Sequence, residues 1–236
     1  MELLILSLGI FAGFFVQTIF GFAASIFIFP IILLAESFCG VHAISSVFYL
    51  IFSAILLPRN FREIDFVAFK KLAVGMTIGF ICGVQILQNF DPFWLKKFFG
   101  VAIIFYVISQ FFPRVKFNPP DWSGVLFGFF GGFFSGVFAF GGPFFVIFAH
   151  GKIPNPRNLR ATIIAILAIS NFLRIPLFWQ NGLLSSEVFL KSLSLFPAFF
   201  AAIFLGEKIS RKIQPKKFRQ LFLVLIFFSG VVLAIR

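Results

Sequence analysis

Apolar residues fill most of this chain in long runs that only short polar segments interrupt. The runs cover, to within a few residues, 3–35, 41–57, 67–88, 93–112, 122–150, 160–179, 187–206 and 217–235. The breaks between them hold Pro, Gly, Asn and Asp, which favour turns. Most runs approach or exceed the roughly 20 residues that cross a bilayer as a helix, and they lack the alternation of a transmembrane β-strand. The pattern predicts an all-α polytopic membrane protein.

Composition supports this prediction and excludes a soluble domain. Sixty per cent of the residues are hydrophobic and 12% are charged, whereas soluble domains carry about 25% charged residues. The net charge of +12 comes from Lys and Arg in the segments between apolar runs. That distribution is typical of cytoplasmic loops, so we expect contact with membrane lipid and no binding of nucleic acid.

Two runs are longer than one crossing, and both carry a similar interruption. The first copy reads GFFVQTIFGFAAS, from Gly13 to Ser25, and the second reads GGFFSGVFAFGGP, from Gly131 to Pro143. They align at an offset of 118 in a chain of 236 residues, with small residues at matched places. A broken apolar segment repeated in both halves is typical of the binding site of a secondary transporter.

The distribution of Lys and Arg predicts that each interrupted run reverses direction. If every run crossed once, the two sides of the membrane would carry nine and eleven of these residues. If both interrupted runs are hairpins, 15 of the 20 fall on one side and five on the other. The positive-inside rule favours the hairpins. Re-entrant and thin double-pass hairpins both satisfy this count.

Hairpins give each half an odd number of crossings, which inverts one half relative to the other. We therefore expect two inverted repeats of about four helical units each, the first unit of each being a broken helix or hairpin. Residues 1–112 form the first repeat, 113–121 a linker and 122–236 the second repeat, within one membrane domain. The basic side is cytoplasmic, and both termini lie outside.

A break inside a membrane helix creates a place for an anion. The next half-helix begins with N–H groups that lack intrahelical partners, and these groups and the helix dipole favour negative charge. Half-helices are expected to start near 23–25 and near 142–144, with Pro143 in a first-turn position. The candidate binding residues at the two breaks are Gln17, Thr18, Gly21, Ala23, Ala24, Ser25, Ser135, Gly136, Gly141 and Gly142. For the Ser, Thr and Gln side chains, a hydrogen bond within or between helices is the alternative.

The run 160–179 contains the other candidates. Ser170 lies beside Asn171, which shares a helix face with Arg174, and an ionisable residue in an apolar segment suggests function. Arg174 is only about five residues from the end of the run, so snorkelling to the outer surface is the alternative. At the offset of 118, Leu56 corresponds to Arg174 and Ser53 to Asn171, so any role of Arg174 is asymmetric.

Several classes of function have no support in the sequence. All eight acidic residues stand at or near the ends of runs, which argues against a cation pump and for an anionic substrate. His42 and His150 also lie at run ends, where an interfacial role is expected. We find no nucleotide-binding motif, zinc spacing or nucleophile–base pair, so we expect neither an enzyme nor a metal or cofactor site.

At these residues the chain resembles the sulfite exporter TauE/SafE family, also called the toluene sulfonate uptake permease family. The resemblance covers nearly the whole chain and departs from the family's glycine cluster at Ala23-Ala24, which replaces two glycines. It rests on Gly13–Pro30, Gly128–His150, the Arg160-Ala-Thr opening, Ser170-Asn-Phe-Leu-Arg174, and the closing Pro197, Gly206, Gln214-Pro-Lys-Lys-Phe-Arg219 and Ser229-Gly230. It implies transport of sulfur-containing anions across a prokaryotic inner membrane.

The sequence thus leads to two hypotheses of different classes. The first is a secondary transporter, in the direction of export, for a small sulfur-containing anion such as sulfite or an organosulfonate, working by alternating access between inverted repeats. The second is a non-transporting membrane subunit that docks a partner or lipid through basic cytoplasmic loops, especially 208–219. Homo-oligomerisation stays open in both.

Overall fold

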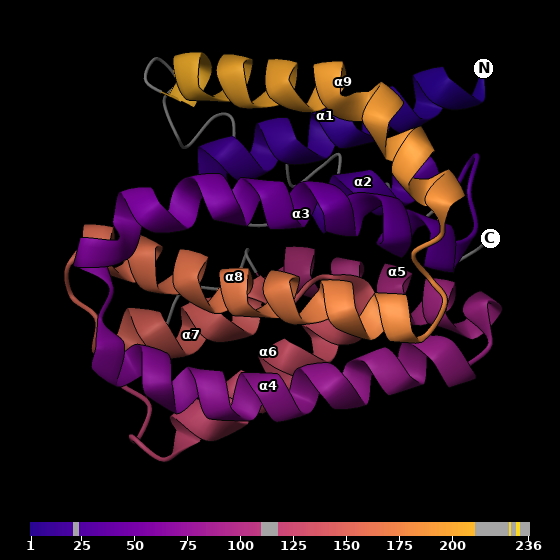
Figure 1. Ribbon diagram of the computed structural model, residues 1–236. Coiled ribbons are helices and arrows are strands. Elements are labelled where there is room, and N and C mark those ends of the chain that lie inside the picture. Colours follow the sequence, from indigo (N-terminus) through magenta and orange to yellow (C-terminus); the bar gives the residue numbers. More distant parts are fainter. Residues whose placement is uncertain (21–23, 110–117, 211–226, 228–229, 232–236) are drawn as a thin grey trace. The chain divides into compact units, whose positions relative to one another are not determined.

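The computed structural model describes residues 1–20, 24–109, 118–210, 227 and 230–231, and these form helices joined by short connections (Figure 1). The bounds are α1 Glu2–Phe20, α2 Ser25–Ile32, α3 Phe38–Asn60, the 3-10 turn η1 Phe61–Glu63, α4 Phe66–Asn89, α5 Pro92–Ser109, α6 Ser123–Phe138, α7 Gly142–Lys152, α8 Pro156–Gln180 and α9 Ser186–Ser210. The described residues contain no strand. The prediction of an all-α protein is therefore confirmed for this part of the chain.

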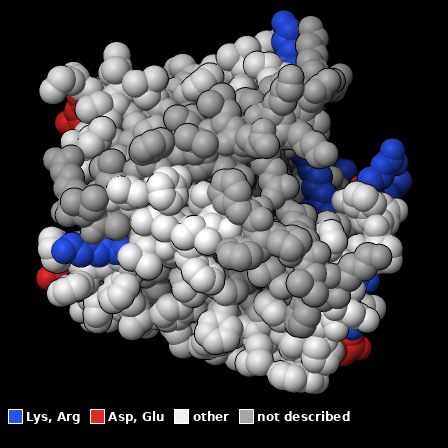
Figure 2. Space-filling model, turned by 180° about the vertical axis from the view of Figure 1, so that it is seen from behind, with Lys and Arg blue, Asp and Glu red and all other residues white. Residues whose placement is uncertain are grey.

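Among the described residues, five helical segments are long and apolar enough to cross a membrane. They are Glu2–Ile19, Phe38–Glu63, Phe66–Asn89, Pro156–Gln180 and Ser186–Ile209. Exposed positions on the described helices carry large apolar side chains, among them Phe105 on α5 and Phe204 on α9. Figure 2 shows few charged side chains among the described residues on the face it draws. Such a surface suits contact with lipid rather than water.

The first interrupted run folds as two packed helices. A Cβ added at Gly13 of α1 would meet Ile28 of α2, and one added at Gly9 would meet Ile32. Because the contact moves forward along α2 as it moves backward along α1, the two helices are antiparallel. The absence of side chains at both glycines allows this close approach.

The second interrupted run forms an antiparallel pair of the same kind. Phe134 of α6 packs on Phe144 of α7 with ring centroids 4.9 Å apart, and Phe127 packs on Phe148 at 6.2 Å. Between the helices Ala139 takes the left-handed conformation, with φ 54°, which ends helices in many proteins. The hairpins predicted from the Lys and Arg counts are thus present in both runs.

The second helix of each hairpin is short. The eight residues of α2 and the eleven of α7 rise about 12 and about 16 Å at 1.5 Å per residue. A bilayer core is roughly 30 Å thick. Neither helix crosses such a core by itself.

The chain divides into two compact units, each drawn from both halves of the sequence. The first unit comprises Met1–Val41, Phe90–Arg114 and Leu190–Arg236, and the second comprises His42–Asn89 and Val115–Phe189. In the first unit, the hairpin α1–α2 packs on α9 through Phe14 and Phe199, whose ring centroids are 4.8 Å apart. In the second unit, the hairpin α6–α7 packs on α4. Each hairpin therefore packs on a helix from the other half of the sequence.

Glycines bring α4 and α6 into backbone contact. A Cβ added at Gly75 would overlap the carbonyl oxygen of Val125, and one added at Gly83 would overlap that of Phe133, so the two helices run parallel. The glycines in this contact are Gly75, Gly79 and Gly83 of α4 and Gly128, Gly132 and Gly136 of α6. Association of helices in lipid depends on such close packing, since no hydrophobic effect draws apolar helices together there.

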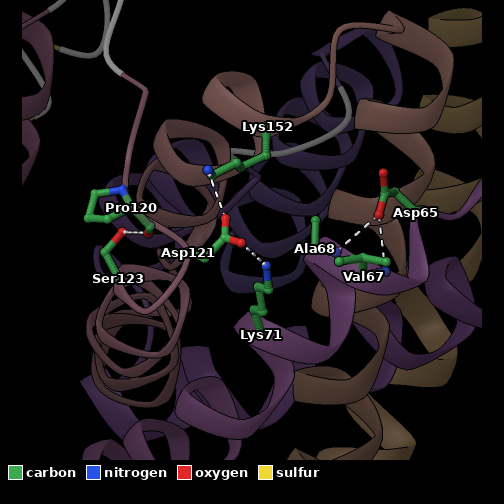
Figure 3. Close-up of polar contacts among 8 residues, drawn as sticks. All are labelled: Asp65, Val67, Ala68, Lys71, Pro120, Asp121, Ser123 and Lys152. Carbon is green, nitrogen blue, oxygen red and sulfur yellow. Dashed lines mark hydrogen bonds and ion pairs between the residues drawn. The ribbon is translucent and has the colours of Figure 1, made fainter.

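An ion cluster joins the open end of each hairpin to its packing helix. In the second unit Asp121, just before α6, bonds Lys71 of α4 and Lys152 of α7, each at 2.8 Å (Figure 3). Lys152 and Lys71 both hold the pKa of the Asp121 carboxyl down, at about 2. The first turns of α4, the residue before α6 and the end of α7 therefore meet at one end of this unit.

The first unit has a corresponding cluster with the charges exchanged. Lys191 of α9 contacts Glu36, which follows α2, at 2.7 Å and Glu2 of α1 at 3.1 Å. One cation here joins two carboxylates, whereas in the second unit one carboxylate joins two cations. Both clusters show that the two ends of each hairpin lie at the same end of its unit.

The order of elements repeats along the chain. In each half, a hairpin is followed by two long helices. The helices α3 and α4 begin at residues 38 and 66, and their counterparts α8 and α9 begin at 156 and 186, which is close to the offset of 118. The hairpin helices α1 and α6 begin at residues 2 and 123, again close to that offset. The residues that would correspond to α5 lie mostly outside the described part of the chain.

The glycine contact between α4 and α6 makes a stability prediction. Gly79→Ala places a methyl group on the Phe129 carbonyl oxygen, and overpacking of this kind costs about 1–3 kcal/mol. We expect a lower thermal unfolding midpoint in detergent. Cys82→Ala on the exposed face of the same helix is the control and should unfold like the wild type. Equal midpoints for all three proteins would contradict the packing.

Asp121 predicts a dependence of stability on pH. Its pKa falls from 3.8 to about 2 in the folded protein, so its ion pairs stabilise the fold above about pH 4 and lose this effect as the pH drops to about 2. Asp121→Asn should therefore lower the unfolding midpoint at pH 7 and should match the wild type near pH 2. The control is Asp65→Asn, because Asp65 bonds the N–H groups of Val67 and Ala68 (Figure 3) and Asn caps helices equally well.

Candidate functional site in the second unit

The C-terminal end of α6 lies inside the second unit, where its last carbonyl groups need donors. A helix end leaves four carbonyls without intrahelical partners. The N–H of Ala139 turns back to the Ser135 carbonyl at 3.0 Å. Arg174 of α8 donates from Nη2 to the same oxygen at 2.7 Å. The guanidinium thus meets the negative end of the α6 dipole, a favourable place for a cation.

Arg174 is buried to 1% exposure, with aromatic rings around its guanidinium. Its Cζ lies 5.3 Å from the ring centroid of Phe80, 5.5 Å from Tyr49 and 6.0 Å from Phe178, distances at which cation–π attraction operates. The alternative of snorkelling to the surface is wrong, because the side chain turns into the helix packing. The location of Arg174 near the end of its apolar run did not reveal this direction.

The positive charge of Arg174 has no carboxylate partner among the described residues. Its Nε–H is buried and donates to no group there. A buried unpaired charge is costly, and real proteins pair it or bind a counter-ion. The α6 dipole supplies only about half a negative charge. The site therefore retains net positive charge and one open donor.

Asn171 connects Arg174 to the opposite helix. Its Oδ1 accepts from Arg174 Nη1 at 3.5 Å, and its Nδ2 donates to Ser53 Oγ of α3 at 2.8 Å. Ser53 and Asn171 are 118 residues apart, which is the repeat offset. The hydrogen bond therefore joins two residues that the sequence offset places at matched positions.

His42 donates to the same turn of α6. The side chain is fully buried, and its Nε2 lies 2.8 Å from the Val137 carbonyl oxygen. Because the partner is a carbonyl, this nitrogen carries the hydrogen. The ring also packs edge-on against Phe178, with centroids 6.1 Å apart. The interfacial role expected for His42 is wrong.

The start of α7 lies beside Ser135. The amides of Gly142 and Phe144 belong to the first turn, Pro143 has no N–H, and the cap residue Gly141 provides no side-chain bond. Gly141 lies against Ser135, where an added Cβ would be 2.9 Å from the Ser135 Cβ. Ser135 Oγ in turn lies 3.4 Å from Arg174 Nη2. Ser135 thus lies between the guanidinium and the α7 start, which carries about half a positive charge.

The comparisons with known proteins are consistent with this geometry. The family model described as "Sulfite exporter TauE/SafE" matches residues 5–233. The chain belongs to the sulfite exporter TauE/SafE family. A relative named "Probable sulfite/organosulfonate exporter TauE", from Cupriavidus necator, is 25% identical over 216 residues, covering 89% of this chain and 84% of the relative. Another, "Probable inner membrane transporter protein TsaS" from Comamonas testosteroni, is 22% identical over 180 residues, covering 73% of each chain. No solved structure matches the chain.

Membership of the TauE/SafE family confirms the resemblance noted in the sequence. It makes the protein a membrane transport protein and not an enzyme. The hypothesis of a non-transporting subunit is not favoured. Most of the basic segment on which that hypothesis depended, 208–219, lies outside the described residues.

The second unit of this TauE/SafE protein brings together several of the predicted binding residues. Ser135, Asn171 and Arg174 are connected by hydrogen bonds. Gly141 and Gly142 form the start of α7 beside them, as the sequence predicted. Gly136 serves packing instead, since an added Cβ would meet the Phe80 carbonyl of α4.

The other predicted residues belong to the first unit. Gln17 is buried in α1. Thr18 donates to the Phe14 carbonyl of its own helix at 2.7 Å, the alternative considered for it. Ala24 caps α2, and Ser25 begins it with a buried hydroxyl that has no partner among the described groups. Gly21 and Ala23 lie outside the described residues.

Residues that the sequence did not assign to the site complete it. They are His42, Tyr49, Phe80 and Phe178. Aromatic residues are so frequent in this chain that no pattern distinguishes these three rings. For His42, the spacing of seven residues to Tyr49 was a usable signal, because seven residues return to the same face of a helix.

The hydrogen bond between Ser53 and Asn171 predicts an energetic coupling. In a double-mutant cycle, Ser53→Ala and Asn171→Ala should couple by about 0.6 kcal/mol, and at most about 1.7 kcal/mol, the range for hydrogen bonds between membrane helices. The unfolding free energy in mixed micelles gives the coupling. The control pair is Ser46→Ala with Asn171→Ala, since Ser46 bonds the Ala43 carbonyl of its own helix. Additive effects of Ser53 and Asn171 would contradict the contact.

Proposed function

We propose that this protein is a secondary transporter, in the direction of export, of a small sulfur-containing anion such as sulfite or an organosulfonate. We infer that the anion binds where α6 ends and α7 begins. The observation that carries this proposal is the buried guanidinium of Arg174, which has no carboxylate partner among the described residues and keeps an open Nε–H. The names of the two relatives support the class of substrate.

The charges at the break suit a single negative charge. The α6 dipole offsets about half of the Arg174 charge, and the α7 start adds about half a positive charge. Together these leave about one positive charge beside Ser135. A sulfonate or sulfite group offers oxygen acceptors for the guanidinium, the Ser135 hydroxyl and the α7 amides. Arg suits such planar and bidentate contacts better than Lys.

We further propose that the two halves are inverted repeats that work by alternating access. The repeated order of elements supports this, as does the hydrogen bond between the equivalent residues Ser53 and Asn171. The basic ends of the helices then face the cytoplasm, and both termini lie outside. A concentration gradient drives the export, and a membrane potential that is negative inside adds to it where the anion moves as a net charge.

Substitution of Arg174 tests the proposed site. Arg174→Gln removes the charge, and loss of a charge-assisted hydrogen bond costs about 1.5–3 kcal/mol. We expect sulfite or methanesulfonate to bind between about 10- and 150-fold more weakly, and counterflow in proteoliposomes to fall accordingly. Arg174→Lys keeps the positive charge but lacks the planar guanidinium with its several donors, so we expect an affinity between those of the wild type and Arg174→Gln.

The matched control is Arg160→Gln, an exposed arginine on the same helix, which should bind like the wild type. Unfolding midpoints separate a binding defect from a folding defect, because Arg174 also bonds the α6 end. A folded Arg174→Gln protein that binds the anion with wild-type affinity would rule out this site. A wild-type protein that moves no sulfur oxyanion or sulfonate would rule out the function.

A further inference from the structure

His42 and Arg174 donate to the same turn of α6 from different helices. His42 bonds the Val137 carbonyl from α3, and Arg174 bonds the Ser135 carbonyl from α8. The ring of Phe178 contacts both, with its centroid 6.1 Å from the imidazole and 6.0 Å from the guanidinium. Two basic side chains therefore flank one aromatic ring at the proposed anion site.

The hydrogen bond of His42 is compatible with both protonation states. Nε2 carries hydrogen in the neutral ring, because its partner is a carbonyl oxygen. A second proton would enter at Nδ1 and leave the bond to Val137 intact. His42 can therefore gain and lose a proton without a change in helix packing, a property that Arg174 lacks because guanidinium stays charged.

The groups around His42 make its protonation depend on the anion. The charged group that acts on it is Arg174. Tyr49, another titratable group, lies on α3 as His42 does and packs on the Arg174 guanidinium. The contacts of His42 with the other two helices are Val137 of α6 and Phe178 of α8. A second positive charge beside Arg174 requires a nearby negative charge, and an anion bound at Ser135 supplies it.

We propose that His42 is the proton-coupling residue of this transporter, binding one proton together with each anion. The inference rests on the proposed anion site. By linkage, an anion that favours protonation of His42 is itself bound more tightly when His42 is protonated, by the same factor. Couplings between sites in proteins are typically 5- to 150-fold.

The coupling has a consequence for the driving force. A monoanion that moves with one proton carries no net charge, so its export depends on the concentration gradients of the anion and the proton, and a membrane potential does not affect it. Without the proton the same anion moves as a charge and responds to the potential. His42 thereby determines which gradient the transporter uses.

The test uses methanesulfonate, which stays a monoanion across the range in which histidine titrates. Titration calorimetry of the full-length wild-type protein, in buffers of different ionisation enthalpy, measures the protons taken up on binding. We expect uptake of up to one proton per anion and an affinity that rises between about 5- and 150-fold as the pH falls from about 8 to about 5. Binding without proton uptake at every pH would overturn the proposal and leave the anion site intact.

The variant for transport is His42→Gln, whose side-chain amide still donates to the Val137 carbonyl but does not titrate. In proteoliposomes the wild type should respond to an imposed pH gradient, and His42→Gln should respond to an imposed potassium diffusion potential instead. His150→Gln is the control, because His150 is exposed; it should behave like the wild type. Identical responses of the wild type and a folded His42→Gln protein would overturn the proposal, whereas a wild type that does not bind methanesulfonate or sulfite would count against the anion site itself.

Discussion

The end of α6 imposes a requirement that the surrounding structure meets. A helix that stops inside an apolar protein leaves carbonyl groups that lipid and apolar side chains do not satisfy. Arg174 and His42 supply the missing donors to Ser135 and Val137. The chain then turns at Ala139 and starts a new helix at Gly142, beside Ser135. The interruption therefore places a buried guanidinium beside a helix start, and the proposed anion site depends on this arrangement.

Backbone contact between α4 and α6 holds this break in place. The glycines of the two helices allow their backbones to touch from Gly75 to Gly83 on α4 and from Gly128 to Gly136 on α6, so α4 supports α6 along most of its length. Phe80 on α4 then lies against the Arg174 guanidinium. At the other end of α6 the Asp121 cluster joins the hairpin to α4. Surface ion pairs contribute little stability by themselves. We therefore regard the glycine contact between α4 and α6 as the main interaction that fixes the position of α6. The Asp121 cluster aligns the ends of α4, α6 and α7.

Sequence reasoning succeeded where a global property decided the answer. Apolar run lengths gave the helices, and the balance of Lys and Arg gave both hairpins, because each depends on the bilayer as a solvent. The start of α7 at Gly142 followed from local chemistry around Pro143. The direction of the Arg174 side chain could not be predicted from the sequence. It depends on which groups of the neighbouring helices lie close to Arg174 once the helices are packed. His42 was missed for that reason, since its donor role needs the α6 end as a partner.

The two halves of the chain use the same architecture with different chemistry. At the offset of 118, Leu56 stands where the second half has Arg174, so the buried charge occurs in one half only. Ala24 caps α2 where Gly142 begins α7, which adds a methyl group at the corresponding position. Yet Ser53 and Asn171 still meet as equivalents. Under the proposed function, the anion binds at the break that Arg174 contacts, and the first half has no matching charge at its own break. The repeated order of elements would then serve the proposed alternating access, and the unmatched charge of Arg174 would serve anion binding.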